Sequence, residues 1–151
     1  MKLELSSYLG LDYAYNNHPG IVRTVDAARE QGLNCETLTH FILRDHLGIK
    51  LPEEMRAMEI FEDDASFKPV PSDAAYELGD IFFFGRENED DAKRLHLAVF
   101  TGNFDQTGDP LLIHANWHDR GVSIWPLGKF AEHKRYKELH TVKRYDPASN
   151  Q

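Results

Sequence analysis

The spacing of apolar residues changes near Leu78, and this change constrains the fold more than any other feature of the sequence. Before Leu78, apolar residues recur at the intervals of an α-helix. After it, they fall into short runs with period two, separated by polar or glycine-containing turns, which is typical of antiparallel strands. Helices followed by strands predict an α+β fold in which N-terminal helices pack on one face of a five-stranded antiparallel sheet.

The helix with the clearest boundaries runs from Cys35 to Leu47. Asn34 can cap its first turn, and Gly48 can adopt the left-handed conformation that ends a helix. Cys35 is therefore expected in the first turn. The other expected elements are two helices, 21–31 and 52–62, and five strands, 81–85, 95–101, 111–116, 122–125 and 139–145. The acidic run 87–91 is expected to be a solvated hairpin loop.

Composition limits the class of protein. A chain of 151 residues, 41% of them hydrophobic, suits one domain spanning residues 1–151. Its 17 Lys and Arg against 25 Asp and Glu give a formal charge of −8, which repels polyanions, so we expect no nucleic-acid partner and no membrane partner. No apolar stretch is long enough to cross a bilayer, and the first residues do not resemble a signal peptide. A single cysteine forms no internal disulfide. These features favour a cytoplasmic protein, with export by a dedicated secretion system as the alternative.

Three residues form a candidate catalytic set. A thiol in the first turn of a helix, as expected for Cys35, is favoured as thiolate by free backbone N–H groups and the helix dipole, so we expect a low pKa. If their strands are hairpin neighbours in register, His96 and His114 can project toward the start of this helix. His96 would take the thiol proton and later give it to the leaving amine. His114 would accept a hydrogen bond from the other ring nitrogen of His96. This chemistry requires no cofactor and no metal.

Other interpretations stay open. Taken alone, Cys35 is better interpreted as an inert core residue, because free cysteine is among the most buried residue types. Zinc held by Cys35, His96 and His114 is the competing chemistry, and His114 with His118 imitates a His-x-x-x-His pair. That pair needs a helix, whereas residues 116–121 are typical of a hairpin turn. The sequence contains no Gly-x-Ser-x-Gly motif, so it gives no indication of a serine hydrolase.

Four segments, taken in order, carry a family resemblance. They are Asn34-Cys-Glu-Thr-Leu38 with Leu47-Gly-Ile-Lys-Leu-Pro52, then Leu78-Gly-Asp-Ile-Phe-Phe-Phe84, Leu95-His-Leu-Ala-Val-Phe-Thr-Gly102 and Leu112-Ile-His-Ala115. They resemble the nucleophile helix, the Pro-Gly-Asp-Leu-x-Phe-Phe strand, the strand of the base and the strand of the third residue in the NlpC-type family of papain-like cell-wall cysteine peptidases. The resemblance covers most of the chain. It implies a papain-like fold with Cys35 as nucleophile, His96 as base and His114 as the orienting residue.

The resemblance also implies residues that bind substrate. Tyr13 resembles the tyrosine of the family's Gly-x-Pro-Tyr motif, which lies at the cleft. The family's Asp-Cys-Ser-Gly, whose Asp and Ser help bind the amino end of the stem peptide, is here Asn34-Cys35-Glu36-Thr37. Asn34 lacks the charge of that Asp, and Glu36 either restores a carboxylate or only favours the helix start. Trp117, in the turn after the His114 strand, is the fourth expected substrate-binding residue.

These observations lead us to expect a cysteine peptidase or amidase that hydrolyses an amide bond through an acyl-enzyme. A peptide or amide is the expected partner, and peptidoglycan stem peptides or their fragments are the leading substrate. One alternative is a cytoplasmic amidase, deamidase or acyltransferase of the same fold that acts on a small molecule or a protein. The other is a catalytically silent binding module, against which the intact Cys35, His96 and His114 set argues.

Overall fold

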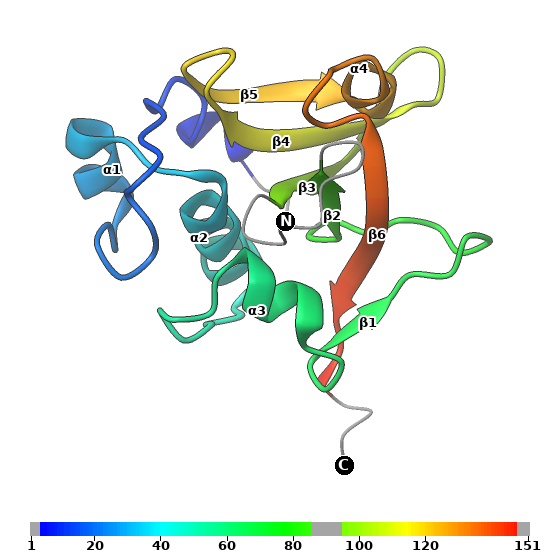
Figure 1. The fold of residues 1–151 in the computed structure, drawn as a ribbon, viewed down its shortest axis with the longest axis horizontal. Coiled ribbons are helices and arrows are strands. Elements are labelled where there is room, and N and C mark those ends of the chain that lie inside the picture. The colour runs from blue at the N-terminus through cyan, green and yellow to red at the C-terminus, as the bar shows by residue number, and fades with distance from the viewer. Residues whose placement is uncertain (1–3, 86–94, 148–151) are drawn as a thin grey trace.

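The computed structural model describes residues 4–85 and 95–147, and it has an α+β fold (Figure 1). Six antiparallel strands form an open sheet in the order β1-β6-β2-β3-β4-β5. The strands are β1 (Phe67–Pro69), β2 (Ile81–Gly85), β3 (His96–Phe104), β4 (Pro110–Asn116), β5 (Gly121–Pro126) and β6 (Glu138–Tyr145). The helices are α1 (Val25–Gln31), α2 (Cys35–Leu47), α3 (Ala57–Glu62), α4 (Leu127–Ala131) and a short 3-10 helix (Leu5–Ser7).

Helix α2 has the boundaries that the sequence predicts. The Asn34 side chain accepts a hydrogen bond from the backbone N–H of Thr37, and Gly48 ends the helix in the left-handed conformation with a φ of 70°. Both signals act within a few residues of the helix end, which is why sequence alone locates them. Cys35 is the first residue of the helix, as expected.

The two other predicted helices are shorter than expected. Helix α1 begins at Val25 and not near residue 21, because the side chain of Thr24 accepts a hydrogen bond from the N–H of Ala27 and caps the helix there. Helix α3 begins at Ala57 and not near residue 52, since the Glu59 carboxylate accepts a hydrogen bond from the Arg56 backbone N–H. In each case a local cap overrides an apolar pattern that extends further toward the N-terminus.

The sheet has one strand more than the five predicted. Strand β1 pairs with β6 at the edge of the sheet over only three residues and ends at Pro69. So short a segment carries no readable alternation, and proline is tolerated because it lies on an edge strand. The five predicted strands are present, although β3 continues to Phe104. The acidic run 87–91 lies outside the described residues.

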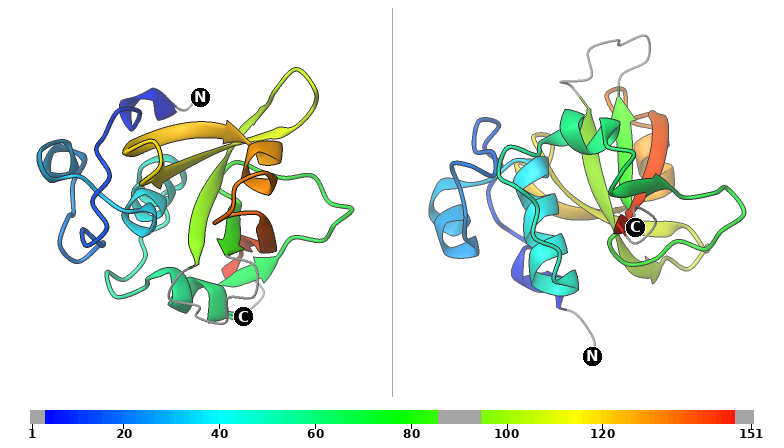
Figure 2. Two further views of the ribbon diagram at one scale, coloured as in Figure 1. Left: turned by 45° about the horizontal axis from the view of Figure 1, so that its top comes forward. Right: turned by 90° about the horizontal axis from the view of Figure 1, so that it is seen from below.

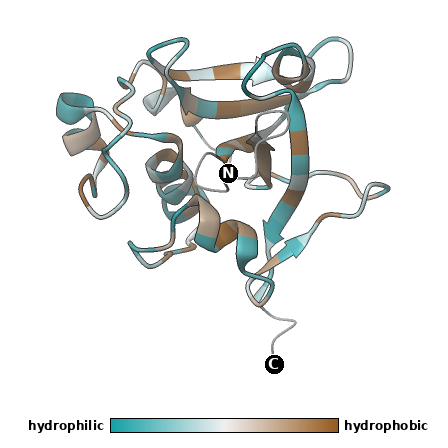
Figure 3. Cartoon of the chain, in the orientation of Figure 1, coloured by the Kyte–Doolittle hydropathy of each residue, from teal (hydrophilic) through white to brown (hydrophobic). Residues whose placement is uncertain are grey.

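Both faces of the sheet are covered, whereas the sequence predicted helices on one face only. On one face, Leu43 of α2 packs with Ile81 and Phe83 of β2. On the other, Phe84 of β2 stacks on Phe130 of α4, with ring centroids 4.5 Å apart. Figure 2 shows α2 and α4 on different sides of the curved sheet. Figure 3 shows that hydrophobic residues recur along the strands and that the connecting loops are largely hydrophilic.

The register of β3 places its alternate residues on the faces that period two predicts. His96 lies opposite Phe84 and therefore shares the face that α4 covers, while Leu97 packs in the cluster that contains Leu43. Within the part of the chain that the structure describes, no helix combines the length and the apolar character needed to span a bilayer.

Candidate active site

A cavity of about 350 Å³ lies where the start of α2, the start of β3 and the segment before β6 come together. Cys35 and His96 both line it, and so does Tyr13 from the N-terminal segment. Arg135 and Tyr136, which follow α4, also line it. The fold therefore brings residues more than 60 positions apart in the sequence to one cavity that contains the only cysteine of the chain.

The Cys35 sulfur lies among backbone N–H groups. The backbone N–H groups of Cys35 and Glu36, at the start of α2, and of Leu97, in β3, each act to lower the pKa of its thiol. Burial nevertheless raises the pKa of the Cys35 thiol to about 12, with a further contribution from the negative charge of Glu36, and the three N–H groups offset only part of this. The expected low pKa is therefore wrong for this arrangement, and Cys35 rests as a thiol.

His96 is held from two sides. Its Nε2 lies 2.8 Å from Nδ1 of His114, and its ring stacks on Tyr136 with centroids 4.1 Å apart. Burial, together with the charge of His133, lowers the pKa of His96 to about 3, so the imidazole is neutral. Because Nε2 is engaged by His114, Nδ1 is the nitrogen that remains for the cavity. The predicted pairing of the two histidines is thus present.

His114 is completely buried behind His96. Its ring contacts Trp125 of β5 and Phe130 of α4, with centroids 4.4 and 4.7 Å away. Burial holds the pKa of His114 well below its ordinary value, as do the charges of His96 and Lys129. Both histidines are therefore neutral in the resting protein. Each ring then has one N–H and one acceptor nitrogen, so the positions of the two protons decide which histidine donates the hydrogen bond.

Asn116 determines which nitrogen of His114 carries the proton. The backbone N–H of Asp119 donates to Oδ1 of Asn116 at 2.7 Å, and a backbone N–H can only donate. The Asn116 amide nitrogen is thereby directed to Oγ of Ser123 at 3.1 Å and to Nε2 of His114 at 3.3 Å. Nε2 of His114 accepts from this amide, so the proton of His114 lies on Nδ1.

The direction of the hydrogen bond between the histidines is consequently the reverse of the prediction. Nδ1–H of His114 donates to Nε2 of His96, and the proton of neutral His96 lies on Nδ1, toward the cavity. For His96 to take a proton at Nδ1, its own proton must move to Nε2. That change moves the proton of His114 to Nε2, where it faces the N–H of Asn116.

The Asn116 side chain is held in place by a polar cluster of Asp119, Ser123 and Trp125, which the sequence did not predict. Ser123 Oγ donates to Oδ2 of Asp119 at 2.7 Å, and Nε1 of Trp125 donates to the same oxygen at 2.7 Å. The hydrogen bonds of the Asp119 carboxylate keep its pKa low in spite of partial burial. The one available signal was the position of Asn116 two residues after His114, on the same face of β4.

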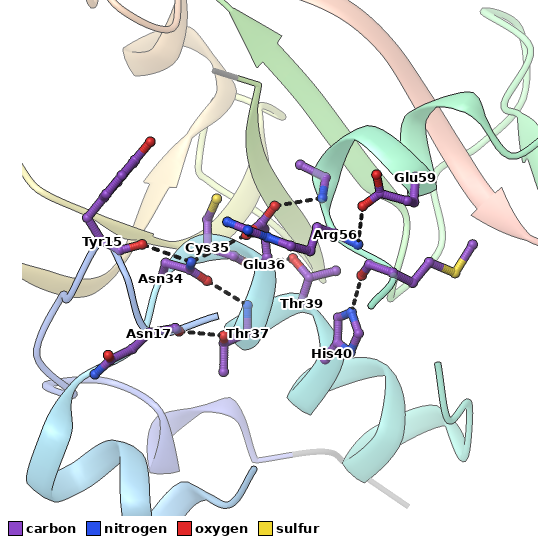
Figure 4. A network of polar contacts seen from close by, with 12 residues as sticks. Tyr15, Asn17, Asn34, Cys35, Glu36, Thr37, Thr39, His40, Arg56 and Glu59 are labelled. Carbon is purple, nitrogen blue, oxygen red and sulfur yellow. Dashed lines mark hydrogen bonds and ion pairs between the residues drawn. The ribbon is translucent and has the colours of Figure 1, made fainter. Parts of the chain in front are cut away.

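Glu36 holds two helices together (Figure 4). Its Oε2 accepts a hydrogen bond from the backbone N–H of Ala57 at 2.7 Å, and its Oε1 accepts from Nε of Arg56 at 2.9 Å and from the Asn34 amide at 3.3 Å. The side chain is buried, and it links the start of α2 to the start of α3. Figure 4 shows the Cys35 sulfur directed away from this network. The Glu36 carboxylate is thus already occupied by partners within the chain.

The expected substrate-binding residues divide into two groups. Tyr13, Asn34 and Glu36 line the cavity with Cys35. Trp117 does not, because it lies in the turn between β4 and β5, is 67% exposed, and borders a separate depression that Tyr13 also lines. The cavity also has lining residues that the sequence did not predict, namely Tyr15, Arg56, Leu95, Arg135 and Tyr136.

Comparisons with protein-family models, with curated proteins and with solved structures found no match for this chain. Within residues 4–85 and 95–147, no three His, Cys, Asp or Glu side chains are arranged to bind a metal ion together. His118 lies in the turn between β4 and β5, so it does not form a helical pair with His114.

Proposed function

We propose that this chain is a papain-like cysteine hydrolase that cleaves amide bonds through an acyl-enzyme. One observation carries the proposal: a thiol at the first residue of α2 shares a cavity with His96, and the other ring nitrogen of His96 is hydrogen-bonded to His114. A nucleophile, a base and a residue that orients the base are the minimum set for this chemistry.

The reaction would begin with a change of tautomer, in which the proton of His96 moves from Nδ1 to Nε2 and that of His114 from Nδ1 to Nε2. The Cys35 thiol would then transfer its proton to the free Nδ1 of His96. The sulfur would attack the carbonyl carbon of the amide, and the Cys35 backbone N–H would stabilise the oxyanion that forms. The imidazolium of His96 then gives its proton to the nitrogen of the leaving amine, and the carbon–nitrogen bond breaks. Water, deprotonated by His96, hydrolyses the thioester and restores the thiol.

The arrangement of elements supports the NlpC-type, papain-like resemblance. The nucleophile helix α2 precedes an antiparallel run of β2, β3 and β4, and the base and third residue come from β3 and β4 in the family's order. Cys35 is only partly buried and lines a cavity, which argues against an inert core residue.

A peptidoglycan stem peptide remains the leading substrate on the resemblance alone. The engagement of Glu36 by Arg56 and Ala57 weakens one part of that expectation, because the carboxylate proposed to pair with a free amino end already has partners. This observation favours the second candidate, an amidase, deamidase or acyltransferase of the same fold that acts on another amide.

Incubation with defined muropeptides and with a panel of peptide amides, followed by mass spectrometry of the products, tests the proposal. We expect cleavage products that are absent with Cys35→Ala. Each peptide should be supplied N-free and N-acetylated, and we expect little discrimination between the two forms. Binding of a substrate without turnover by the wild-type protein would favour a silent binding module. Products that persist in Cys35→Ala would refute a cysteine mechanism.

A further inference from the structure

The charges around the cavity do not balance. The chain carries a formal charge of −8, yet among the described residues that line this cavity two are arginines, Arg56 and Arg135, and only Glu36 is acidic. Arg56 forms an ion pair with Glu36 at 2.9 Å, and that carboxylate also accepts the Ala57 N–H. His96 is neutral. Arg135 therefore leaves the described wall with one positive charge in excess.

Arg135 lines the same cavity as Cys35 and His96. Its positive charge opposes the upward shift in the pKa of both Tyr13 and Tyr136, and both tyrosines also respond to Cys35. The guanidinium and the sulfur thus lie within electrostatic range of the same two phenols. The side chain of Arg135 is exposed, and among the described residues no carboxylate forms an ion pair with it.

The two tyrosines add hydrogen-bond donors to this wall. Burial raises the pKa of Tyr136 to about 12, and it also raises that of Tyr13, so both phenols keep their protons over the ordinary range of pH. A guanidinium beside neutral hydroxyl groups is suited to a carboxylate, which it binds through two parallel N–H groups. An ammonium group would instead meet an unbalanced positive charge.

We propose that the cavity binds amides that carry a carboxylate close to the scissile bond, with Arg135 as its partner. That an amide bond is cleaved beside the carboxylate rests on the proposed function. The anion site itself depends only on the charges and the lining of the cavity. The carboxylate is supplied either by the free C-terminus of a short peptide or by an acidic side chain. The cavity therefore selects for an anionic group and not for a free amino end.

Alkylation of Cys35 tests the site without any turnover. Iodoacetate and iodoacetamide react in the same way, since the sulfur bonds to the methylene carbon and iodide leaves, but only iodoacetate is an anion. The chain has one cysteine, so intact mass reports Cys35 alone. We expect the ratio of the iodoacetate rate to the iodoacetamide rate to exceed that of N-acetylcysteine several-fold, and to fall toward it as salt is added.

Arg135→Gln should lower this ratio several-fold, to about the value for N-acetylcysteine. Lys134→Gln is the matched control, because it removes an exposed positive charge from the neighbouring residue, which does not line the cavity. We expect this control to leave the ratio unchanged. Equal ratios for wild type and Arg135→Gln would overturn the inference, as would a folded protein that resists both reagents while the unfolded chain reacts.

Substrate pairs separate this inference from the proposed hydrolase. Peptides with a free C-terminus are compared with their C-terminal amides, and acidic side chains are compared with Asn or Gln at the same position. Faster cleavage of one carboxylate form, lost in Arg135→Gln, identifies the source of the group. Charge-selective alkylation without cleavage of any amide would refute the hydrolase and retain the anion site. Cleavage without charge selectivity would refute the anion site alone.

Discussion

Replacing Asn116 by Asp should make Cys35 more reactive. In the wild type, the form of His96 that can accept a proton requires Nε2–H of His114 to face the Asn116 amide nitrogen at 3.3 Å. Two donors that face each other lose a buried hydrogen bond, which costs about 1–3 kcal/mol and reduces the population of that form by a factor of roughly 5 to 150. An Asp at this position presents an oxygen of the same size and accepts from Nε2–H of His114.

The size of the effect follows from the same network. A charge-assisted hydrogen bond to a buried carboxylate contributes about 1.5–3 kcal/mol. The carboxylate of Asp119 opposes part of this gain, because Ser123 Oγ links it to position 116 at 2.7 and 3.1 Å. We therefore expect the rate of Cys35 alkylation near neutral pH to increase by about tenfold in Asn116→Asp, at the lower end of that range.

Two measurements check this prediction. Long-range proton–nitrogen NMR spectra identify which ring nitrogen carries the proton in His96 and His114, with signals assigned by His114→Asn. We expect Nδ1–H on both rings in the wild type and Nε2–H on both in Asn116→Asp. Iodoacetamide kinetics then report the reactivity of Cys35. Asn103→Asp, at an exposed position of β3, controls for the added charge.

An Nε2–H proton on His114 in the wild type would refute the orientation of Asn116 inferred from the Asp119 N–H. Equal alkylation rates in Asn116→Asp and Asn103→Asp would show that this hydrogen bond does not control the thiol. Either result would return Asn116 to an ordinary structural role.

The remaining predictions concern the thiol, the two histidines and the link between helices. Because burial raises the pKa of Cys35 to about 12, iodoacetamide should alkylate it more slowly near neutral pH than it alkylates a free cysteine, and the rate should keep rising above pH 9. An alkylation rate that is already maximal below neutral pH would contradict this. His96→Ala should abolish turnover. His114→Asn should retain part of it, because an amide oxygen can accept the hydrogen bond from Nε2–H of His96. Measured kcat/KM values test this, and complete loss in both variants would contradict the distinct roles. Glu36→Gln should lower the free energy of unfolding by about 1–2 kcal/mol, since it weakens the hydrogen bond that the carboxylate accepts from the Ala57 N–H at the start of α3. The lost ion pair with Arg56 adds little, because Arg56 is partly exposed. Denaturation with urea measures this, and exposed Glu54→Gln, the control, should be neutral.

The boundaries of α2 and the faces of β3 were predictable from sequence, while β1 and α4 were not. The cap at Asn34 and the left-handed Gly48 act through contacts with their immediate neighbours. Strand β1 is three residues long, and α4 is five. Segments of this length form because a sheet edge or a sheet face is already present to receive them, so their own residues carry little signal.

The candidate site divides in the same way. The sequence by itself determined that Cys35 begins a helix and which residues share a strand face with His96 and with His114, because capping and alternation depend on residues a few positions apart. That these two strands are neighbours in the register that brings the histidines together was decided by the sheet. Only the tertiary structure decided that Arg135 lines the cavity and that the Glu36 carboxylate accepts a hydrogen bond from the Ala57 N–H, since these contacts join segments that are distant in the chain. The direction of the hydrogen bond between the histidines was decided in the same manner, by Asn116 and the turn that orients it, because a proton position depends on every donor and acceptor around the ring.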